Sequence, residues 1–354
     1  MCHPVVMEAS RFKTTSSQVA QLSLHGIMWL TVLLLIAWAV GAIYYFEFLP
    51  APASDVLALM YLVTTATLML RWPNRIKWLR VTMASVVVIY LLTLLQRPSN
   101  ERNWAPDNAQ LANVKIRGDD VLIDGFRHTV YRTETDADIH FRKFDFKLSQ
   151  LEKVWFVVQR FTALEGIAHN FLTFGLQSAD GPRYFSVSIE IRREQGESFS
   201  PIRGLYRQYE LIYIVADERD EIGGRTVMRP DDQVFMFPCK ASPEQVQQLF
   251  VEIAQRIQQL NDAPRFYHSL LNNCTNCIVR HTYTLTPKPI NWLDPRIVLP
   301  GYADRFAFSN DLLSPEPAQT FSEFQTQCRI DQIARRAGIS EDFSADIRVR
   351  FNGL

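Results

Sequence analysis

The chain has 354 residues, more than one hydrophobic core usually organises, and its apolar residues are unevenly spread, so two parts are expected. Its 37 basic and 37 acidic residues give a formal net charge of zero. This balance excludes the global basic field that marks nucleic-acid binders. The five cysteines are Cys2, Cys239, Cys274, Cys277 and Cys328. They are too few and too scattered for a disulfide scaffold.

Three apolar segments near the N-terminus, at residues 24–46, 55–70 and 78–95, predict membrane helices. The first is long enough to cross a hydrocarbon core of roughly 30 Å. A signal peptide is the alternative for this segment, but the apolar run is too long and no small-residue cleavage site follows it. Residues 1–96 are therefore expected to anchor the protein in a membrane.

The distribution of Lys and Arg predicts the orientation of these helices. Basic residues precede the first segment and cluster between the second and third, at Arg11, Lys13, Arg71, Arg75, Lys77 and Arg80. The connection at residues 47–55 has no basic residue. Three crossings then place the rest of the chain in the periplasm, outside a bacterial cytoplasmic (inner) membrane. If the second segment only re-enters the membrane, the rest of the chain lies inside instead.

Residues 97–113 are rich in Pro and Asn without an apolar period and are predicted to be a linker. Residues 114–292 are expected to form a catalytic domain, and residues 293–354 an extension that packs on it. Apolar alternation predicts strands at residues 121–126, 154–161, 170–176, 184–192 and 210–216. The predicted fold class is α+β with an antiparallel sheet.

Besides a helix at about residues 275–283, two helices are predicted in the part of the chain that follows these strands. Ser242 is a good N-cap and Pro243 a good first residue for a helix whose apolar residues recur at helical spacing. A second, short helix is expected around residues 321–337.

Cys274 and His169 are the candidate catalytic residues. Cys274 follows an Asn pair and precedes a predicted helix, where unpaired backbone N–H groups and the helix dipole stabilise a thiolate. His169 opens a predicted strand, and a neutral imidazole against the thiol would act as its general base.

Glu190 is a candidate orienting residue because of the turn sequence QSADGP. If that turn closes a hairpin centred between Ala179 and Asp180, residues whose numbers sum to about 359 face each other. Glu190 then lies opposite His169, close enough for its carboxylate to orient the imidazole.

The segments AHNFLTFGL, YFSVSIEIRRE and FYHSLLNNCTN resemble the Lnb-type N-terminal periplasmic domain, a domain of unknown function related to bacterial lipoprotein N-acyltransferases. The resemblance covers roughly residues 141–283. It implies a permuted papain-like (NlpC-type) fold in which the histidine strand precedes the cysteine helix. It also implies Cys274 as nucleophile, His169 as base and Glu190 as a third polar residue. Three membrane segments before the domain differ from the acyltransferases that gave the family its name, so the acceptor stays open.

Other interpretations of the same residues remain. Cys274 and Cys277 form a CxxC pair, typical of redox or zinc sites, but no second pair completes four zinc ligands. Asn273, Tyr206 and Arg207 are candidate substrate-binding residues, with Arg207 as an anion-binding group. His281 is too far along its predicted helix, about 10 Å by rise, to serve Cys274 directly.

The sequence therefore predicts a membrane-anchored, cysteine-dependent acyltransferase or hydrolase that forms a thioester and needs no cofactor. The expected partners are the lipid bilayer and a lipoprotein or phospholipid acyl donor, with no nucleic acid. A cell-wall peptide amidase or endopeptidase is one alternative, since papain-like folds perform both reactions. A non-catalytic module that binds an envelope partner is another.

Overall fold

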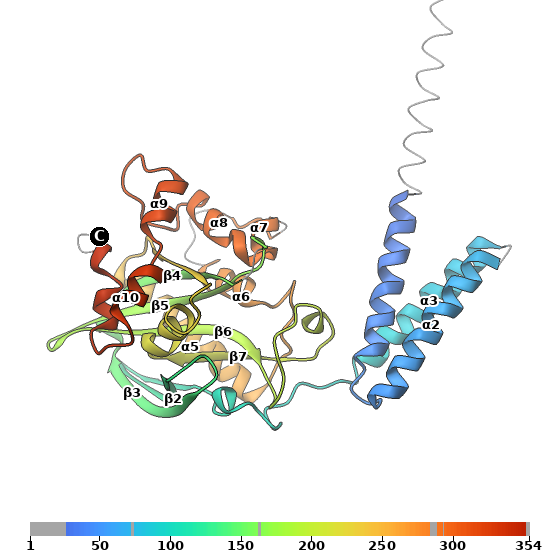
Figure 1. Cartoon of the computed structure of the whole chain (residues 1–354), viewed down its shortest axis with the longest axis horizontal. Coiled ribbons are helices and arrows are strands. Elements are labelled where there is room, and N and C mark those ends of the chain that lie inside the picture. The colour runs from blue at the N-terminus through green and yellow to red at the C-terminus, as the bar shows by residue number, and fades with distance from the viewer. Residues whose placement is uncertain (1–25, 72–73, 162–163, 284–288, 293, 352–354) are drawn as a thin grey trace, which may run out of the picture. The chain divides into compact units, whose positions relative to one another are not determined.

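The computed structural model describes residues 26–71, 74–161, 164–283, 289–292 and 294–351 (Figure 1). The chain divides into two compact units, Met1–Arg97 and Pro98–Leu354. The N-terminal residues Cys2, Arg11 and Lys13, considered above, lie outside the described residues.

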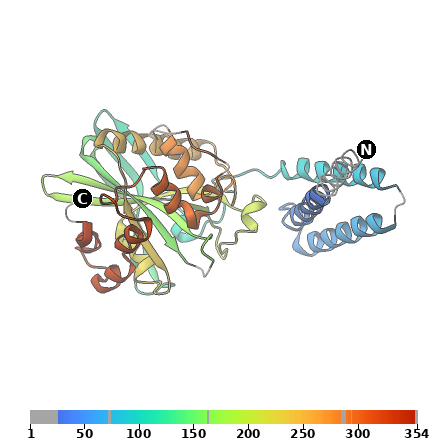
Figure 2. The same ribbon diagram turned by 90° about the horizontal axis from the view of Figure 1, so that it is seen from above.

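The first unit contains three helices long and apolar enough to cross a membrane: Gly26–Tyr44, α2 (Ala51–Arg71) and α3 (Arg75–Thr93). They lie side by side (Figures 1 and 2). The rings of Trp29 and Trp78 are 5.7 Å apart, and the hydroxyls of Tyr61 and Ser85 are 2.9 Å apart. Most of their large apolar side chains stay exposed, as expected of helices surrounded by lipid. The prediction of three apolar helices is confirmed.

In the second unit, the described residues form one eight-stranded sheet in the order β1-β2-β7-β6-β5-β4-β8, with β3 paired to β2. The strands are β1 (Asn113–Arg117), β2 (Asp120–Tyr131), β3 (Ala137–Lys147), β4 (Leu151–Arg160), β5 (His169–Ser178), β6 (Gly181–Arg192), β7 (Glu210–Ala216) and β8 (Gln233–Pro238).

The prediction of a purely antiparallel sheet is wrong, because β2 and β7 pair in parallel at Arg127 and Ala216. These two strands are far apart in the sequence and no turn joins them, so the turn signals said nothing about their relative direction. Each of the other pairings is antiparallel, and β4, β5, β6 and β7 are consecutive neighbours. The domain is therefore α+β with a mixed sheet.

Helix α5 (Pro243–Asp262) packs its apolar stripe on one face of the sheet. Ser242 caps it as predicted: its hydroxyl accepts from the N–H of Gln245, whose side chain accepts from the N–H of Ser242. Beneath it, Phe250 meets the rings of Phe174 and Phe185 at centroid distances of 5.8 and 5.7 Å. This aromatic core holds β5 and β6, the strands that carry His169 and Glu190.

The remaining helices are short and lie mostly after β8 in the chain. They are α4 (Gly224–Thr226), α6 (Cys274–Thr282), α7 (Pro295–Val298), α8 (Ala303–Ser309), α9 (Phe321–Gln327), α10 (Asp331–Ala337) and α11 (Phe343–Asp346).

The single helix predicted around residues 321–337 is instead two helices, α9 and α10. The chain between them runs along β8: Met236 donates its N–H to the carbonyl of Cys328 at 2.8 Å, and Ile330 donates to Val234 at 2.9 Å. Pairing with a sheet edge takes the backbone groups that a continuous helix would have used. In this way the C-terminal extension becomes part of the sheet domain.

The segment predicted as a linker is held on the second unit by hydrogen bonds. Ser99 donates its N–H to Glu210 Oε1 at 3.0 Å, and Asn100 Nδ2 donates to the carbonyl of Asn261 at 2.9 Å. Further along, the Arg192 guanidinium lies 4.1 Å from the ring centroid of Trp104. Only the residues between the end of α3 and Ser99 are left to connect the two units.

Candidate cysteine–histidine site

Cys274 is the first residue of α6, and its side chain is buried. The helix begins here because Asn273 caps it: Asn273 Oδ1 accepts from the N–H of Asn276 at 2.9 Å. Asn273 Nδ2 donates to the carbonyl of Ser269, and the residue is fully buried. Asn273, expected to bind substrate, therefore positions the nucleophile instead.

The β5–β6 hairpin has the register expected from its turn, in which facing residue numbers sum to 359. Its pairs run from Ser178 and Gly181 at the turn to Phe171 and Ser188. Continuing this register by two residues brings His169 opposite Glu190. The atoms His169 Nε2 and Glu190 Oε1 are 3.5 Å apart.

Ser188, which the sequence analysis missed, connects the two residues. Its hydroxyl donates to Glu190 Oε1 at 2.7 Å, and the hydroxyl oxygen, Ser188 Oγ, lies 2.7 Å from His169 Nε2. Because the hydroxyl proton is directed at the carboxylate, Ser188 Oγ accepts a hydrogen bond from His169 Nε2–H. This leaves Nδ1 as the nitrogen able to take the thiol proton. Ser188 lies two residues before Glu190 on the same sheet face, so strand periodicity alone could have found it.

The interaction of His169 with Cys274 favours the charged form of each residue. Burial opposes charge on both, yet the hydrogen bonds with Cys274 and Glu190 raise the pKa of His169 to about 9. Burial likewise raises the pKa of Cys274, but the hydrogen bond with His169 and the N–H of Asn170 bring it below the ordinary value. Both shifts favour a thiolate paired with an imidazolium.

Arg225 is a second residue that the sequence analysis missed, and it holds Glu190 ionised. Its Nη2 lies 2.5 Å from Glu190 Oε1, and its other arm pairs with the buried Glu221. Burial would raise the pKa of Glu190, but Arg225 and His169 hold that pKa well below its usual range. Arg225 is 35 residues beyond Glu190 and reaches it through the π-helical turn η4 (Arg219–Gly223), so no local pattern announces it.

The other described cysteines are also free thiols, but their pKa values are raised rather than lowered. Burial raises the pKa of Cys239 to about 12 and that of Cys277 to about 11, and it also raises that of Cys328. Cys277 Sγ lies 3.5 Å from Asn272 Oδ1, inside the protein. His281 bonds the Tyr213 hydroxyl at 2.8 Å, away from the nucleophile. Among the described residues, no group of three or more His, Cys, Asp and Glu is placed to hold a metal ion.

We expect iodoacetamide to alkylate Cys274 at pH 7 at least about tenfold faster than Cys239 or Cys328, because the reactive species is the thiolate. The lowered pKa of Cys274 also predicts that its rate stays high as the pH falls below the range of an ordinary thiol. Peptide mass spectrometry across a pH series would measure both effects. In a His169→Asn variant, the pH below which the alkylation rate falls should rise toward that of an ordinary cysteine. Equal rates for the three cysteines would contradict a thiolate at this site.

A cavity of about 370 Å³ opens at the cysteine. His169, Glu190 and Cys274 line it together with Tyr267 and the aromatic rings of Phe161 and Phe199. Four arginines also contribute to its wall, namely Arg127, Arg193, Arg225 and Arg229.

Tyr206 and Arg207, proposed above as substrate-binding residues, do not belong to the cavity wall that the described residues form. The Arg207 guanidinium lies 5.8 Å from the ring centroid of Phe266 instead.

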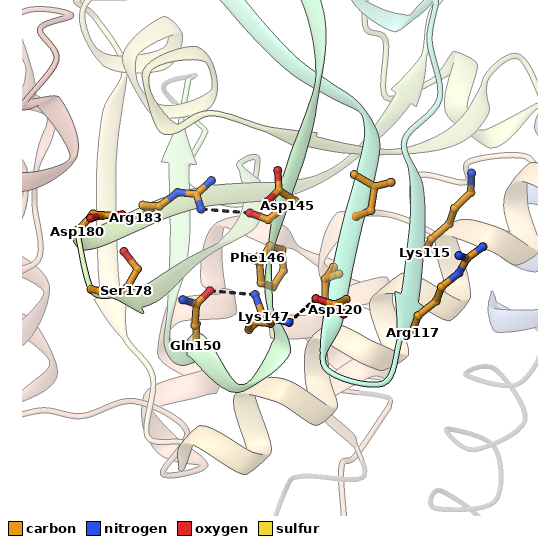
Figure 3. A pocket seen from close by; sticks show the side chains of 13 residues that line it. Lys115, Arg117, Asp120, Asp145, Phe146, Lys147, Gln150, Ser178, Asp180 and Arg183 are labelled. Carbon is orange, nitrogen blue, oxygen red and sulfur yellow. Dashed lines mark hydrogen bonds and ion pairs between the residues drawn. The ribbon is translucent and has the colours of Figure 1, made fainter.

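A larger cavity, of about 570 Å³, lies at the turn end of the β5–β6 hairpin (Figure 3). Two of its basic side chains bond within the protein: Lys147 Nζ is 2.5 Å from Asp120, and Arg183 donates to the carbonyl of Asp145 at 3.1 Å. The described residues lining it include neither cysteine nor histidine. The smaller cavity is the better candidate for chemistry, because it joins a nucleophile to a base.

Residues 139–300, a little less than half of the chain, match the sequence profile of the Lnb N-terminal periplasmic domain. This segment includes β5, β6 and α6, and so contains Cys274, His169 and Glu190. No curated protein and no solved structure matches the chain. The resemblance noted from the sequence is thereby confirmed over this segment.

Proposed function

We propose that this chain, whose residues 139–300 match the Lnb N-terminal periplasmic domain, is a membrane-anchored cysteine acyltransferase or hydrolase. The observation that supports this most directly is the constellation of Cys274, His169 and Glu190 at the wall of one cavity. A nucleophile, a base and a residue that orients the base are the parts that thiol acyl transfer requires.

In the proposed reaction, the Cys274 thiolate attacks the carbonyl carbon of an ester or amide. The tetrahedral intermediate collapses, the bond to the leaving group breaks, and the imidazolium of His169 gives that group its proton. A thioester remains on Cys274. An amine, or water, then attacks the thioester while His169 takes its proton, and the thiolate leaves. Glu190 stabilises the imidazolium throughout, as the carboxylate does in other catalytic triads.

The start of α6 supplies the proposed oxyanion site. Asn273 Oδ1 accepts from the N–H of Asn276. The N–H groups of Cys274 and Thr275 lie in the same first turn of the helix, where backbone N–H groups have no partner within the helix. Such groups stabilise the negative charge that develops on a carbonyl oxygen during attack.

The membrane supplies the proposed substrate. In the proposed topology, the three apolar helices cross the inner membrane and the domain faces the periplasm. A short connection to the anchor raises the local concentration of the site at the bilayer. We therefore favour an acyl donor carried by a phospholipid or a lipoprotein, and an amine such as a lipoprotein N-terminus as acceptor.

A cell-wall peptide amidase is a second candidate, favoured by one specific observation. Arg193 and Arg229 line the cavity with side chains 35% and 45% exposed, and each pairs with a carboxylate of the protein, Asp107 and Glu134, that a substrate carboxylate would have to replace or share. Guanidinium groups bind carboxylates well, and cell-wall peptides carry carboxylates.

The test is mass spectrometry of lipoprotein N-termini in a host that lacks its own N-acyltransferase. We expect the intact protein to add an acyl chain to the terminal amine and the Cys274→Ala variant to add none. If neither protein acylates while Cys274 reacts rapidly with iodoacetamide, hydrolysis of another substrate becomes the better account. If Cys274 is also unreactive, the domain is a binding module.

A further inference from the structure

Five large apolar side chains are exposed on three loops of the second unit. Their exposed fractions are Leu164 65%, Phe199 43%, Ile202 60%, Leu270 45% and Leu271 66%. A single exposed apolar residue is ordinary, but a group around one opening marks an interaction surface. We call these five residues the apolar rim.

The three loops are held to one another. Ser269 donates its N–H to the carbonyl of Gly204 at 3.2 Å and its hydroxyl to that of Pro201 at 2.6 Å. The rings of Phe161 and Phe199 meet edge to face at 6.3 Å, which joins the loop before β5 to the loop before β7. These contacts join the three loops, and they hold the loop with Phe199 and Ile202 against the loop with Leu270 and Leu271.

This surface borders the cysteine cavity. Phe199 belongs to the rim and also to the cavity wall, and Phe161, its ring partner, lines the same wall. Leu271 lies three residues before the nucleophile. A partner that covers the rim would therefore also cover the entrance to Cys274.

The first residues of the second unit bond near the base of a loop that carries part of the rim. Ser99 binds Glu210, the first residue of β7, and Glu210 pairs with Phe266, which leads into the loop carrying Leu270 and Leu271. Five residues separate the end of α3 from Ser99, so six steps of roughly 3.5 Å give a span of at most about 21 Å. The base of this loop is therefore bonded to the start of the second unit, which follows the third apolar helix after a short connection.

We propose that the apolar rim docks on the lipid surface of the membrane, with its side chains inserted among the acyl chains. This inference rests on the proposed function only in taking the first unit to cross the membrane. Apolar side chains on a rigid surface bind the headgroup boundary through the area that they bury. Docking would place the mouth of the cysteine cavity at the depth where lipid ester carbonyls lie.

Photolabelling tests the docking directly in the full chain, reconstituted in bilayers that contain a phospholipid with a diazirine on its acyl tail. We expect adducts on peptides carrying the apolar rim. Val130 and Val349 are the controls, because they are 46% and 61% exposed but lie outside the rim. Labelling of rim peptides no greater than of control peptides would overturn the proposal. So would protection of the rim that depends on protein concentration, which would indicate a second copy as its partner.

A pair of variants separates docking from chemistry. Ile202→Glu combined with Leu271→Glu is expected to reduce rim labelling at least fivefold and acyl transfer from bilayer lipid by a similar factor. Alkylation of Cys274 by iodoacetamide should stay unchanged, because this small reagent does not need the membrane. Val349→Glu should change neither rim labelling, nor acyl transfer, nor alkylation of Cys274. Because labelling needs no turnover, rim labelling in a protein without acyltransferase activity would support docking and refute only the proposed reaction.

Discussion

Replacing His169 by alanine is expected to slow acyl transfer by about a thousandfold, and Cys274→Ala is expected to reduce it to the uncatalysed background. General acid–base catalysis contributes about 10²–10⁴ to a rate. Here the imidazole also holds the thiol as a thiolate, because its hydrogen bond and charge lower the pKa of Cys274. Loss of His169 therefore removes both the proton shuttle and much of the activated nucleophile. Single-turnover acyl release from a chromogenic thioester would measure this effect.

The double variant is the sharper part of this test. Residues that act as one unit give losses that do not add, so Cys274→Ala with His169→Ala should be no slower than Cys274→Ala alone. His140→Ala is the matched control, because His140 is exposed on β3. Its rate should equal that of the intact protein. Additive losses for the two site residues would show that they act separately, and the proposed pair would be abandoned.

The features that could be predicted from sequence are local ones. The turn QSADGP determines the register of the β5–β6 hairpin, and that register brings Glu190 to His169 across two strands. The caps at Ser242 and Asn273 lie where polar side chains precede a helix.

The features that were missed depend on contacts between distant segments. Arg225 reaches Glu190 only because β7 and η4, which precede it in the chain, bring it to that side of the sheet. The parallel contact of β2 with β7 joins strands that no turn connects, so no local sequence signal predicts it. Tyr206 and Arg207 were placed by composition alone. Composition does not say which way a loop faces, and this loop turns Arg207 to Phe266.

Replacing Arg348 by methionine is expected to destabilise the second unit by about 3–5 kcal/mol, because it leaves a buried carboxylate without its partner. Arg348 donates from Nη1 to Glu218 Oε2 at 2.7 Å and from Nη2 to Glu218 Oε1 at 2.5 Å. Its guanidinium also lies over the rings of Trp155 and Tyr184. Glu218 is fully buried. Thermal unfolding of the full chain, followed by tryptophan fluorescence, should show a Tm lower by roughly 10 °C.

Two further variants determine whether the buried charge is the cause. Arg350→Met, two residues along and exposed, should change stability by less than about 0.5 kcal/mol. Adding Glu218→Gln to Arg348→Met should recover part of the loss, because the neutral amide is cheaper to bury than an unpaired carboxylate. If Arg348→Met unfolds at the same temperature as Arg350→Met, the C-terminal residues do not stabilise the sheet through this pair. Recovery in the double variant would instead establish that residues after 293 complete the face of the sheet that carries Glu190.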